Sequence, residues 1–139
     1  PYIDVSQKNN LSQNKQAGAR KKPERVEGTL SCELPKILVK KNDIHITSKR
    51  NFDCFQDTEL DMLLKRTLNV ENIIICGVNT DTCVYGTTFG ASNRGYNPII
   101  IECCTGSMRG EDQHITALKI MSQSIAWVMK KEEILNKLN

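Results

Sequence analysis

Residues 72–90, NIIICGVNTDTCVYGTTFG, constrain the fold of this chain more than any other stretch. The all-apolar run at residues 73–76 predicts a strand buried on both faces, as in parallel sheets. A polar turn follows Gly77, and Cys83 then opens a segment of helical length. A strand, a tight turn and a helix in this order place Cys83 at the carboxyl end of a strand, where open α/β sheets bind their ligands.

Cys83 is the candidate nucleophile. A helix N-terminus favours negative charge, so a thiol located there ionises more readily than a free one. The alternative is a buried structural thiol, which is the more common role of an isolated cysteine. We expect Cys76, inside the strand, to lie in the core. Cys103 and Cys104 leave a later strand at the same edge, and they either pack in the core or line the site.

The rest of the chain alternates predicted strands and helices. Residues 6–25 are polar, have no periodic apolar face and predict a long loop. The predicted strands are residues 44–47, 73–76, 98–101 and 126–129, with residues 37–39 as a further strand or the approach to one. The predicted helices are residues 58–68, 83–93, 113–124 and 132–138. Alternation with short links predicts an α/β fold with a parallel sheet and right-handed crossovers.

Two glycines, Gly86 and Gly90, lie one turn apart in the helix that follows Cys83. Glycine costs about 1 kcal/mol per helix position relative to alanine, so two on one face require a compensating contact. They predict close packing on the sheet or on a partner. Gly95 is predicted to end this helix as a left-handed cap.

Composition narrows the class of protein. The chain has 139 residues, 39% of them hydrophobic, which is enough for one domain with a core. No apolar run approaches the ~20 residues that span a bilayer, and the start lacks a signal-peptide pattern. The six cysteines form neither a regular disulfide framework nor paired metal spacing, which favours reduced thiols and a cytoplasmic protein.

The basic residues are concentrated in the first part of the chain. Residues 1–50 hold 11 of the 19 Lys and Arg residues and 5 of the 16 Asp and Glu residues. They contain one aromatic residue, Tyr2, whereas nucleic-acid grooves place aromatic rings beside the charge for bases to stack on. We therefore expect a solvated loop, and neither nucleic acid nor membrane as a partner.

Three blocks of sequence, in register along the chain, carry a resemblance to a known family. The central block is GVNTDTCV at residues 77–84, with Thr87 on the next turn and RGY at residues 94–96. The upstream block has the spacing K-x-x-[FY]-S-A-F-x-x-T-x-L and consists of Lys49, Phe52, Phe55, Thr58 and Leu60. The third block is His114 with Ala117 and Leu118. This pattern resembles the isochorismatase-like cysteine hydrolases, which include nicotinamidases and N-carbamoylsarcosine amidohydrolases.

The resemblance implies a three-layer α-β-α fold around a six-stranded, mainly parallel, Rossmann-like sheet. We expect residues 1–139 to form a single domain of this kind that lacks the N-terminal strand and helix. Family members usually form oligomers, so a homo-oligomer is expected. The resemblance implies no cofactor, and no cluster of metal ligands precedes the lysine.

The activity implied is hydrolysis of a small amide, ureido or related C–N (or isochorismate-like) substrate by a Cys-Lys-Asp triad. Cys83 matches the nucleophile that forms a covalent intermediate, and Lys49 matches the lysine that holds the thiolate ionised. The triad aspartate is not identified. Asp4 is the only candidate, but it better matches the end of the second strand of the fold.

The resemblance further implies a cis peptide bond between Val78 and Asn79. This geometry would aim the N–H groups of Asn79 and Cys83 at one point as an oxyanion hole. Residues expected to line the substrate pocket are Phe52, Phe55 and Thr80. The two phenylalanines fit equally well as packing beneath the helix.

Several positions depart from the family pattern, among them Asp53 in place of a common serine and Asn79 in place of Ala or Ser. A non-catalytic member that acts as a binding or oligomer scaffold is therefore the alternative. A redox or flavodoxin-like nucleotide module is disfavoured, because no glycine-rich phosphate motif is present. His114 is expected to anchor a helix start or loop, since no second His or Cys is spaced to share a metal.

Overall fold

The structure of the chain is a computed structural model that describes residues 28–30 and 33–138. The chain divides into two compact units, Pro1–Arg50 and Asn51–Asn139. Asp4 and the predicted loop at residues 6–25 lie outside the described residues.

The described part of the first unit contains the 3₁₀ helix η2 (Lys36–Leu38). The strands predicted at residues 37–39 and 44–47 are both wrong. Pro35 fixes a φ of −55° that suits a tight helical turn, and its carbonyl accepts the N–H of Leu38 at 2.9 Å. Residues 44–47 have the alternation of a strand, but no described segment pairs with them.

The second unit alternates helices and strands in the predicted order. Its elements are α2 (Leu60–Met62), η3 (Leu63–Thr67), β1 (Asn72–Val78), η4 (Thr80–Val84), α3 (Tyr85–Asn93), β2 (Asn97–Gly106), α4 (Glu111–Ser124), β3 (Trp127–Met129) and α5 (Lys131–Leu138). The helix predicted at residues 58–68 corresponds to α2 and the π-helical η3, which run on without a break. Gly95 has the predicted left-handed conformation, with φ +83°.

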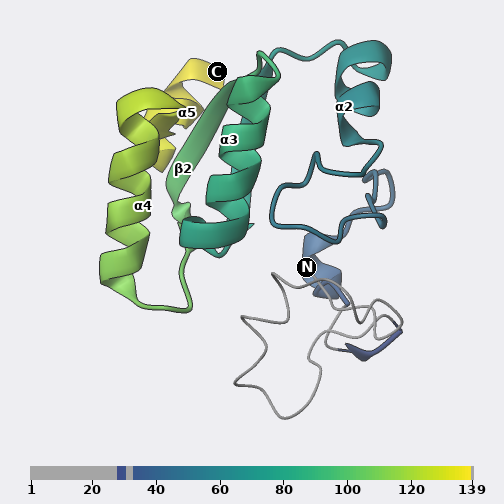
Figure 1. Cartoon of the computed structure of the whole chain (residues 1–139), viewed down its shortest axis with the longest axis horizontal. Coiled ribbons are helices and arrows are strands. Elements are labelled where there is room, and N and C mark those ends of the chain that lie inside the picture. Colours follow the sequence, from purple (N-terminus) through teal and green to yellow (C-terminus); the bar gives the residue numbers. More distant parts are fainter. Residues whose placement is uncertain (1–27, 31–32, 139) are drawn as a thin grey trace. The chain divides into compact units, whose positions relative to one another are not determined.

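The three strands form a parallel sheet in the order β1-β2-β3. Figure 1 shows α3 and α4 in front of β2, with β2 running behind them. An α/β fold with a parallel sheet, predicted from the alternation of elements, is confirmed. Because the strands are parallel, the carboxyl ends of β1 and β2 meet at one edge of the sheet, which is where Cys83 follows β1.

The core lies between the sheet and the two helices in front of it. Ile100 of β2, Ala91 of α3 and Met121 of α4 are fully buried there. The buried residues of α4 are Ala117, Leu118 and Met121, which recur at helical spacing and form its apolar face. Ile115 and Ile120 of the same helix are exposed.

β1 is less buried than its all-apolar sequence predicts. Ile75 is buried, but Ile74 is 43% exposed and Cys76 is exposed. Within the described residues β1 pairs with one strand only, β2, so it lies at an edge of the described sheet. An edge strand has fewer neighbours to cover its side chains, which accounts for the difference.

β2 extends beyond its predicted end at residue 101. It continues through Cys103 and Cys104 to Gly106, in a stretch expected to be loop. Both cysteines are exposed, so core packing of either is wrong. The loop that follows the strand begins at Ser107 and ends at Gly110, the N-cap of α4.

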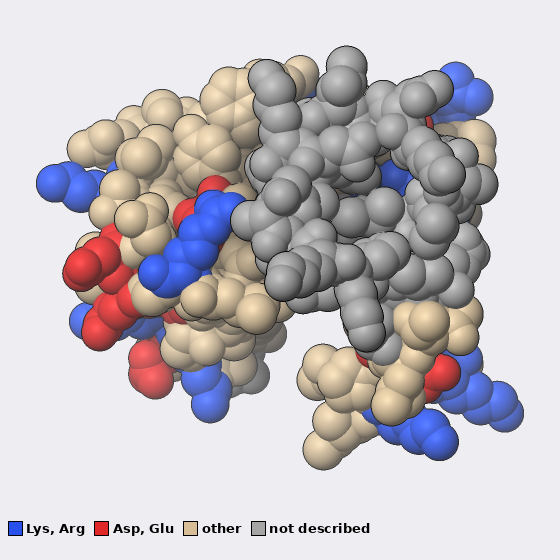
Figure 2. Space-filling view, turned by 60° about the horizontal axis from the view of Figure 1, so that its bottom comes forward, with Lys and Arg blue, Asp and Glu red and all other residues tan. Residues whose placement is uncertain are grey.

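The described surface carries charges of both signs. On the face shown in Figure 2, acidic and basic side chains intermingle over the described residues instead of separating into one broad patch. Among residues 28–30 and 33–138, no helix combines the length and apolar character that a membrane crossing requires.

Candidate active site

The turn between β1 and α3 positions Cys83. The Val78–Asn79 peptide bond is cis, as the resemblance predicted. The Asn79 carbonyl then accepts the N–H groups of Thr82 at 3.1 Å and Val84 at 3.0 Å. These two donors flank Cys83, so the backbone on both sides of the thiol is tied to one carbonyl oxygen.

Cys83 itself is half-buried at the carboxyl edge of the sheet. It was predicted to open the helix, but helical winding begins three residues earlier, at Thr80. The thiol therefore lies inside the π-helical turn η4, which leads directly into α3. Its predicted place at the strand-to-helix junction is confirmed, whereas its role as nucleophile stays a prediction.

The loop after β2 is fastened to this turn by side chains of both segments. The Met108 N–H donates to Asn79 Oδ1 at 2.9 Å. The Ser107 hydroxyl donates to Asp81 Oδ1 at 2.6 Å, and Arg109 Nη1 lies 2.7 Å from Asp81 Oδ2. Two neighbouring strand ends are thus joined across the sheet edge that carries the thiol.

Asp81 is the centre of this connection. Its side chain is only 9% exposed. Burial by itself would raise the pKa of Asp81, but the hydrogen bonds from Ser107 and Arg109 outweigh burial and hold that pKa below its ordinary value. The carboxylate is therefore ionised, and its negative charge is balanced by Ser107 and Arg109 of the loop.

Thr80 and His114 make a third link, between the turn and α4. The Thr80 side chain is fully buried, and its Oγ1 lies 2.8 Å from Nδ1 of His114. His114 thus anchors the start of α4 to the turn, the kind of role expected for it. Thr80 was predicted to line the substrate pocket, but its hydroxyl is engaged by His114.

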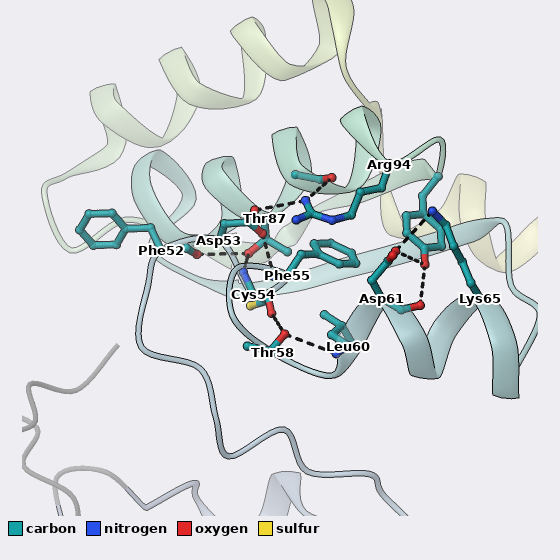
Figure 3. A network of polar contacts seen from close by, with 12 residues as sticks. Phe52, Asp53, Cys54, Phe55, Thr58, Leu60, Asp61, Lys65, Thr87 and Arg94 are labelled. Atoms are coloured by element: carbon teal, nitrogen blue, oxygen red, sulfur yellow. Dashed lines mark hydrogen bonds and ion pairs between the residues drawn. The ribbon is translucent and has the colours of Figure 1, made fainter.

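Phe52 to Thr58 form a loop that packs on α3, and Figure 3 shows its contacts. The Cys54 N–H donates to Thr87 Oγ1 at 3.1 Å, and that hydroxyl donates to the Phe52 carbonyl at 3.3 Å. Asp53 accepts the N–H of Phe55 at 2.8 Å and lies 3.4 Å from Arg94. The loop is therefore held to the helix that begins beside Cys83.

The two glycines of α3 make room for this loop. A Cβ at Gly90 would lie 2.6 Å from Asp53 Cγ, well inside contact distance. A Cβ at Gly86 would meet the Phe52 and Asp53 backbone at an ordinary 3.5 Å. The glycines were predicted to pack closely on the sheet or on a partner; Gly90 does make a close approach, but to a loop of the same chain.

The two candidate pocket phenylalanines differ in their surroundings. Phe55 is buried and stacks on Tyr96 with ring centroids 5.6 Å apart, while the Arg94 guanidinium lies 4.9 Å from its centroid. Its ring is therefore part of the packing beneath α3, the second of its two expected roles. Phe52 is half-buried, and Figure 3 shows its ring directed away from Asp53 and Arg94.

Tyr96 closes this packing on the side of α2. Its hydroxyl donates to Asp61 Oδ1 at 2.8 Å. Burial first, and then the neighbouring Asp61, raise the pKa of Tyr96 to about 12. Tyr96 is therefore a neutral hydrogen-bond donor, which ties α2 to the strand start that follows Gly95.

Lys49, the predicted triad lysine, is half-buried and belongs to the first unit, whereas Cys83 belongs to the second. Its pairing with the thiol stays a prediction. Among the described residues, no group of three or more His, Cys, Asp and Glu side chains has an arrangement that could hold a metal ion.

A cavity of about 340 Å³ lies elsewhere in the second unit. Its lining includes Tyr96, Asn97 and Pro98 at the start of β2 and Trp127 at the start of β3. These residues mark the amino ends of the strands, opposite to the edge that carries Cys83. The cavity contains none of the predicted site residues.

The contacts that sequence reasoning missed are those of the loop Ser107–Gly110. A signal was present, because a Ser-Met-Arg sequence lies a few residues after the predicted strand and directly follows the observed β2. Carboxyl ends of adjacent parallel strands meet, so polar residues after one strand are expected near those after the next. The contacts of this loop were not predicted because β2 is longer than expected, and the strand was predicted to end five residues too early.

Comparison with known proteins matches both the sequence and the fold. The family model of the Isochorismatase domain matches residues 4–133. YecD of Escherichia coli O157:H7, an uncharacterized isochorismatase family protein, is 34% identical over 97 residues, which make up 70% of this chain and 50% of that protein. YwoC of Bacillus subtilis, also an uncharacterized isochorismatase family protein, is 29% identical over 76% of this chain and 54% of its own length. The chain thus spans about half the length of the curated relatives it matches.

Solved structures of proteins with a similar fold support the family match. An isochorismatase-like hydrolase from Alkaliphilus metalliredigens has a TM-score of 0.77 and 25% identity, covering 84% of this chain and 62% of its own. The nicotinamidase PncA from Bacillus subtilis has a TM-score of 0.69 and 26% identity, covering 78% of this chain and 63% of its own. The chain belongs to the isochorismatase family, as its motifs predicted.

Proposed function

We propose that this chain carries the nucleophile of a cysteine hydrolase that acts on a small amide, ureido or related C–N (or isochorismate-like) compound. The observation that carries the proposal is the placement of Cys83. It is half-buried at the carboxyl edge of the sheet, in a turn whose backbone is tied to the Asn79 carbonyl on both sides of the thiol. A turn held in this way orients the thiol toward a bound substrate. Orientation of the reacting groups supplies much of the rate acceleration of enzymes.

The proposed reaction has two steps. The Cys83 thiolate attacks the substrate carbonyl carbon, and the negative charge that develops on the oxygen is bound by the N–H groups of Asn79 and Cys83. Collapse of this intermediate expels the amine or ammonia, which takes up a proton, and leaves a thioester on Cys83. Water then attacks the thioester, which releases the carboxylic acid and restores the thiol.

The roles of the remaining residues follow from this scheme. Lys49 is proposed to supply the cation that favours the thiolate. Of the two candidate pocket phenylalanines, Phe52 is the one proposed to contact the substrate, because the Phe55 ring is buried against Tyr96. The third member of the triad is not assigned to a residue. The reaction as proposed uses no metal and no cofactor.

An aromatic amide is the first substrate to test. The PncA protein of Bacillus subtilis, 26% identical to this chain, is a nicotinamidase. We propose further that the protein is cytoplasmic and forms a homo-oligomer, and that it binds neither nucleic acid nor membranes. Residues 1–50, where the basic residues gather, contain a single aromatic residue, which disfavours a nucleic-acid groove.

Trapping of the covalent intermediate tests the proposal. The purified protein is mixed with nicotinamide, quenched in acid and examined by intact-mass and peptide mass spectrometry. The expected result is an acyl group on Cys83 that is absent in Cys83→Ala. Cys54→Ala is the matched control, because Cys54 is also half-buried and lies on the neighbouring loop. A small-amide panel without adduct or hydrolysis would favour the scaffold alternative.

A further inference from the structure

Three thiols outside the candidate site gather where β1 and β2 pair irregularly. Cys76 lies on β1, and Cys103 and Cys104 lie on β2. All three are free and exposed. The reaction proposed above uses none of them.

The strand register brings Cys76 and Cys104 together. Ile75 pairs with Ile100, and the next pair on β1 is Gly77 with Thr105. Cys76 lies at the irregularity between these two pairs, Cys104 directly precedes Thr105, and the Cys76 and Cys104 side chains are hydrogen-bonded to each other. Neighbouring strands lie about 4.8 Å apart, which is within the Cα separations of about 4.4–6.8 Å that a disulfide spans.

The electrostatics of the thiols agree with this placement. Burial raises the pKa of Cys76, and the charge and hydrogen bonding of Cys104 raise it further, with a smaller effect from Cys103. Of the two neighbours, Cys104 is the one hydrogen-bonded to Cys76. This hydrogen bond places the two sulfur atoms within reach of each other.

A metal site is a poorer fit for this cluster. No group of three or more His, Cys, Asp and Glu residues within the described ranges is arranged to hold a metal ion. A bond between two sulfur atoms needs only the one pair that the register supplies. Cys103 is also hydrogen-bonded to Cys104, but it affects Cys76 through its charge alone, so Cys104 is the cysteine in direct contact with Cys76.

We propose that Cys76 and Cys104 form a reversible disulfide that cross-links β1 to β2, with a low-molecular-weight disulfide such as glutathione disulfide as the oxidant. The Cys104 thiolate attacks one sulfur of the oxidant and expels a small thiolate, which leaves a mixed disulfide on Cys104. The Cys76 thiolate then attacks the Cys104 sulfur and expels the second small thiolate. Two protein thiols are oxidised, one small disulfide is reduced, and the two thiol protons pass to the released small thiols.

The bond would join the strand that leads to Cys83 with the strand whose following loop holds Asp81. Cys76 is three residues before Asn79, and Cys104 is three residues before Ser107. The cross-link therefore lies directly behind the two segments that meet at the candidate site. It is a modification site distinct from the nucleophile.

Differential alkylation with peptide mapping tests the proposal. The protein is equilibrated with glutathione disulfide, free thiols are blocked, the disulfides are reduced and the released thiols receive a second label. Cleavage before Asp81, combined with cleavage after Lys and Arg, separates Cys76 from Cys83 and gives one peptide containing Cys103 and Cys104. A parallel digest kept unreduced is expected to contain these two peptides cross-linked, about 2 Da below the sum of their masses for the two thiol hydrogens lost, and the reduced sample is expected to carry the second label on Cys76 and Cys104.

Variants decide which cysteine takes part. Cys104→Ser is expected to abolish the cross-linked peptide, and Cys103→Ser, the matched control one residue away, is expected to retain it. Mapping of the unaltered protein needs no variant and so does not depend on how the variants fold. A bond from Cys76 to Cys103, a bond between Cys103 and Cys104, glutathione adducts without a cross-link, or no oxidation would each overturn the proposal. Because hydrolysis is not measured, this result is independent of the proposed function.

Discussion

The buried hydroxyl of Thr80 lies 2.8 Å from Nδ1 of His114, which joins the turn before Cys83 to the first turns of α4. These residues are 34 positions apart in the chain. The bond crosses the edge of the sheet where the candidate nucleophile lies. Together with the contacts of Asp81, it makes the turn part of a rigid assembly of three segments.

Removing either partner of this bond is expected to destabilise the protein. His114→Ala leaves the Thr80 hydroxyl buried without its partner, so the free energy of unfolding should fall by about 1–3 kcal/mol. Urea unfolding followed by circular dichroism measures the change. His45→Ala is the control, since His45 is exposed and its replacement should change stability by less than about 0.5 kcal/mol.

A double-mutant cycle separates this bond from other effects of the substitution. Thr80→Val keeps the shape of the side chain and removes the hydroxyl, so combining it with His114→Ala leaves no orphaned partner. The double variant should be more stable than the sum of the two single losses predicts. Strictly additive losses would show that the two side chains are not coupled.

Asp81 should make stability depend on pH. Its folded pKa lies below the ordinary 3.8, so the ionised carboxylate stabilises the fold above pH 3.8, and this contribution disappears as pH falls through the folded pKa. Asp81→Asn should therefore lower the free energy of unfolding at neutral pH by about 1 kcal/mol. The expected loss is kept this small because Arg109 is 55% exposed, so solvent screens its charge.

The comparison is made by urea unfolding at neutral pH and in acid. The stability gap between Asp81→Asn and the unaltered protein should close in acid, where the carboxyl group is protonated. Glu71→Gln, which removes an exposed carboxylate outside the helices, serves as the control. A gap of equal size at both pH values would contradict the assignment of the charge.

Gly90 and Gly86 should respond in opposite directions to alanine. Gly90→Ala places a methyl group against the Asp53 carboxylate, so the free energy of unfolding should fall by about 1–3 kcal/mol. Gly86→Ala makes only ordinary contacts at 3.5 Å and should be neutral or stabilising by up to about 1 kcal/mol through helix propensity. Thermal or urea unfolding of both variants gives the comparison.

The shorter serine side chain offers a rescue of the first substitution. Asp53→Ser, added to Gly90→Ala, withdraws the carboxylate that the new methyl group meets. The double variant should recover part of the lost stability. Failure to recover any would place the cause of the loss elsewhere than the Asp53 contact.

The sequence predicted the elements of the second unit well, because their signals are local. The apolar spacing of α4 and the left-handed cap at Gly95 depend on residues within a few positions of each other. The family motif predicted the cis bond at Val78–Asn79 and the place of Cys83. The fold class followed from the alternation of elements.

What the sequence could not supply depends on partners distant in the chain. Residues 44–47 have the pattern of a strand, but a strand also needs a neighbour to pair with. Gly90 predicted a close approach without indicating that Asp53, 37 positions earlier, makes it. Cys76 was expected in the core because it belongs to an apolar run. Its exposure depends instead on how many strands flank β1, and among the described residues only β2 does.

The most direct test of the central claim is the rate of ammonia release from nicotinamide and other small amides by the purified protein, its Cys83→Ala variant and the Cys54→Ala control. The account predicts that Cys83→Ala lowers kcat/KM at least about 1,000-fold, because the covalent step is lost, while Cys54→Ala stays close to the unaltered protein. Equal rates for Cys83→Ala and the unaltered protein would contradict the assignment of Cys83 as the nucleophile.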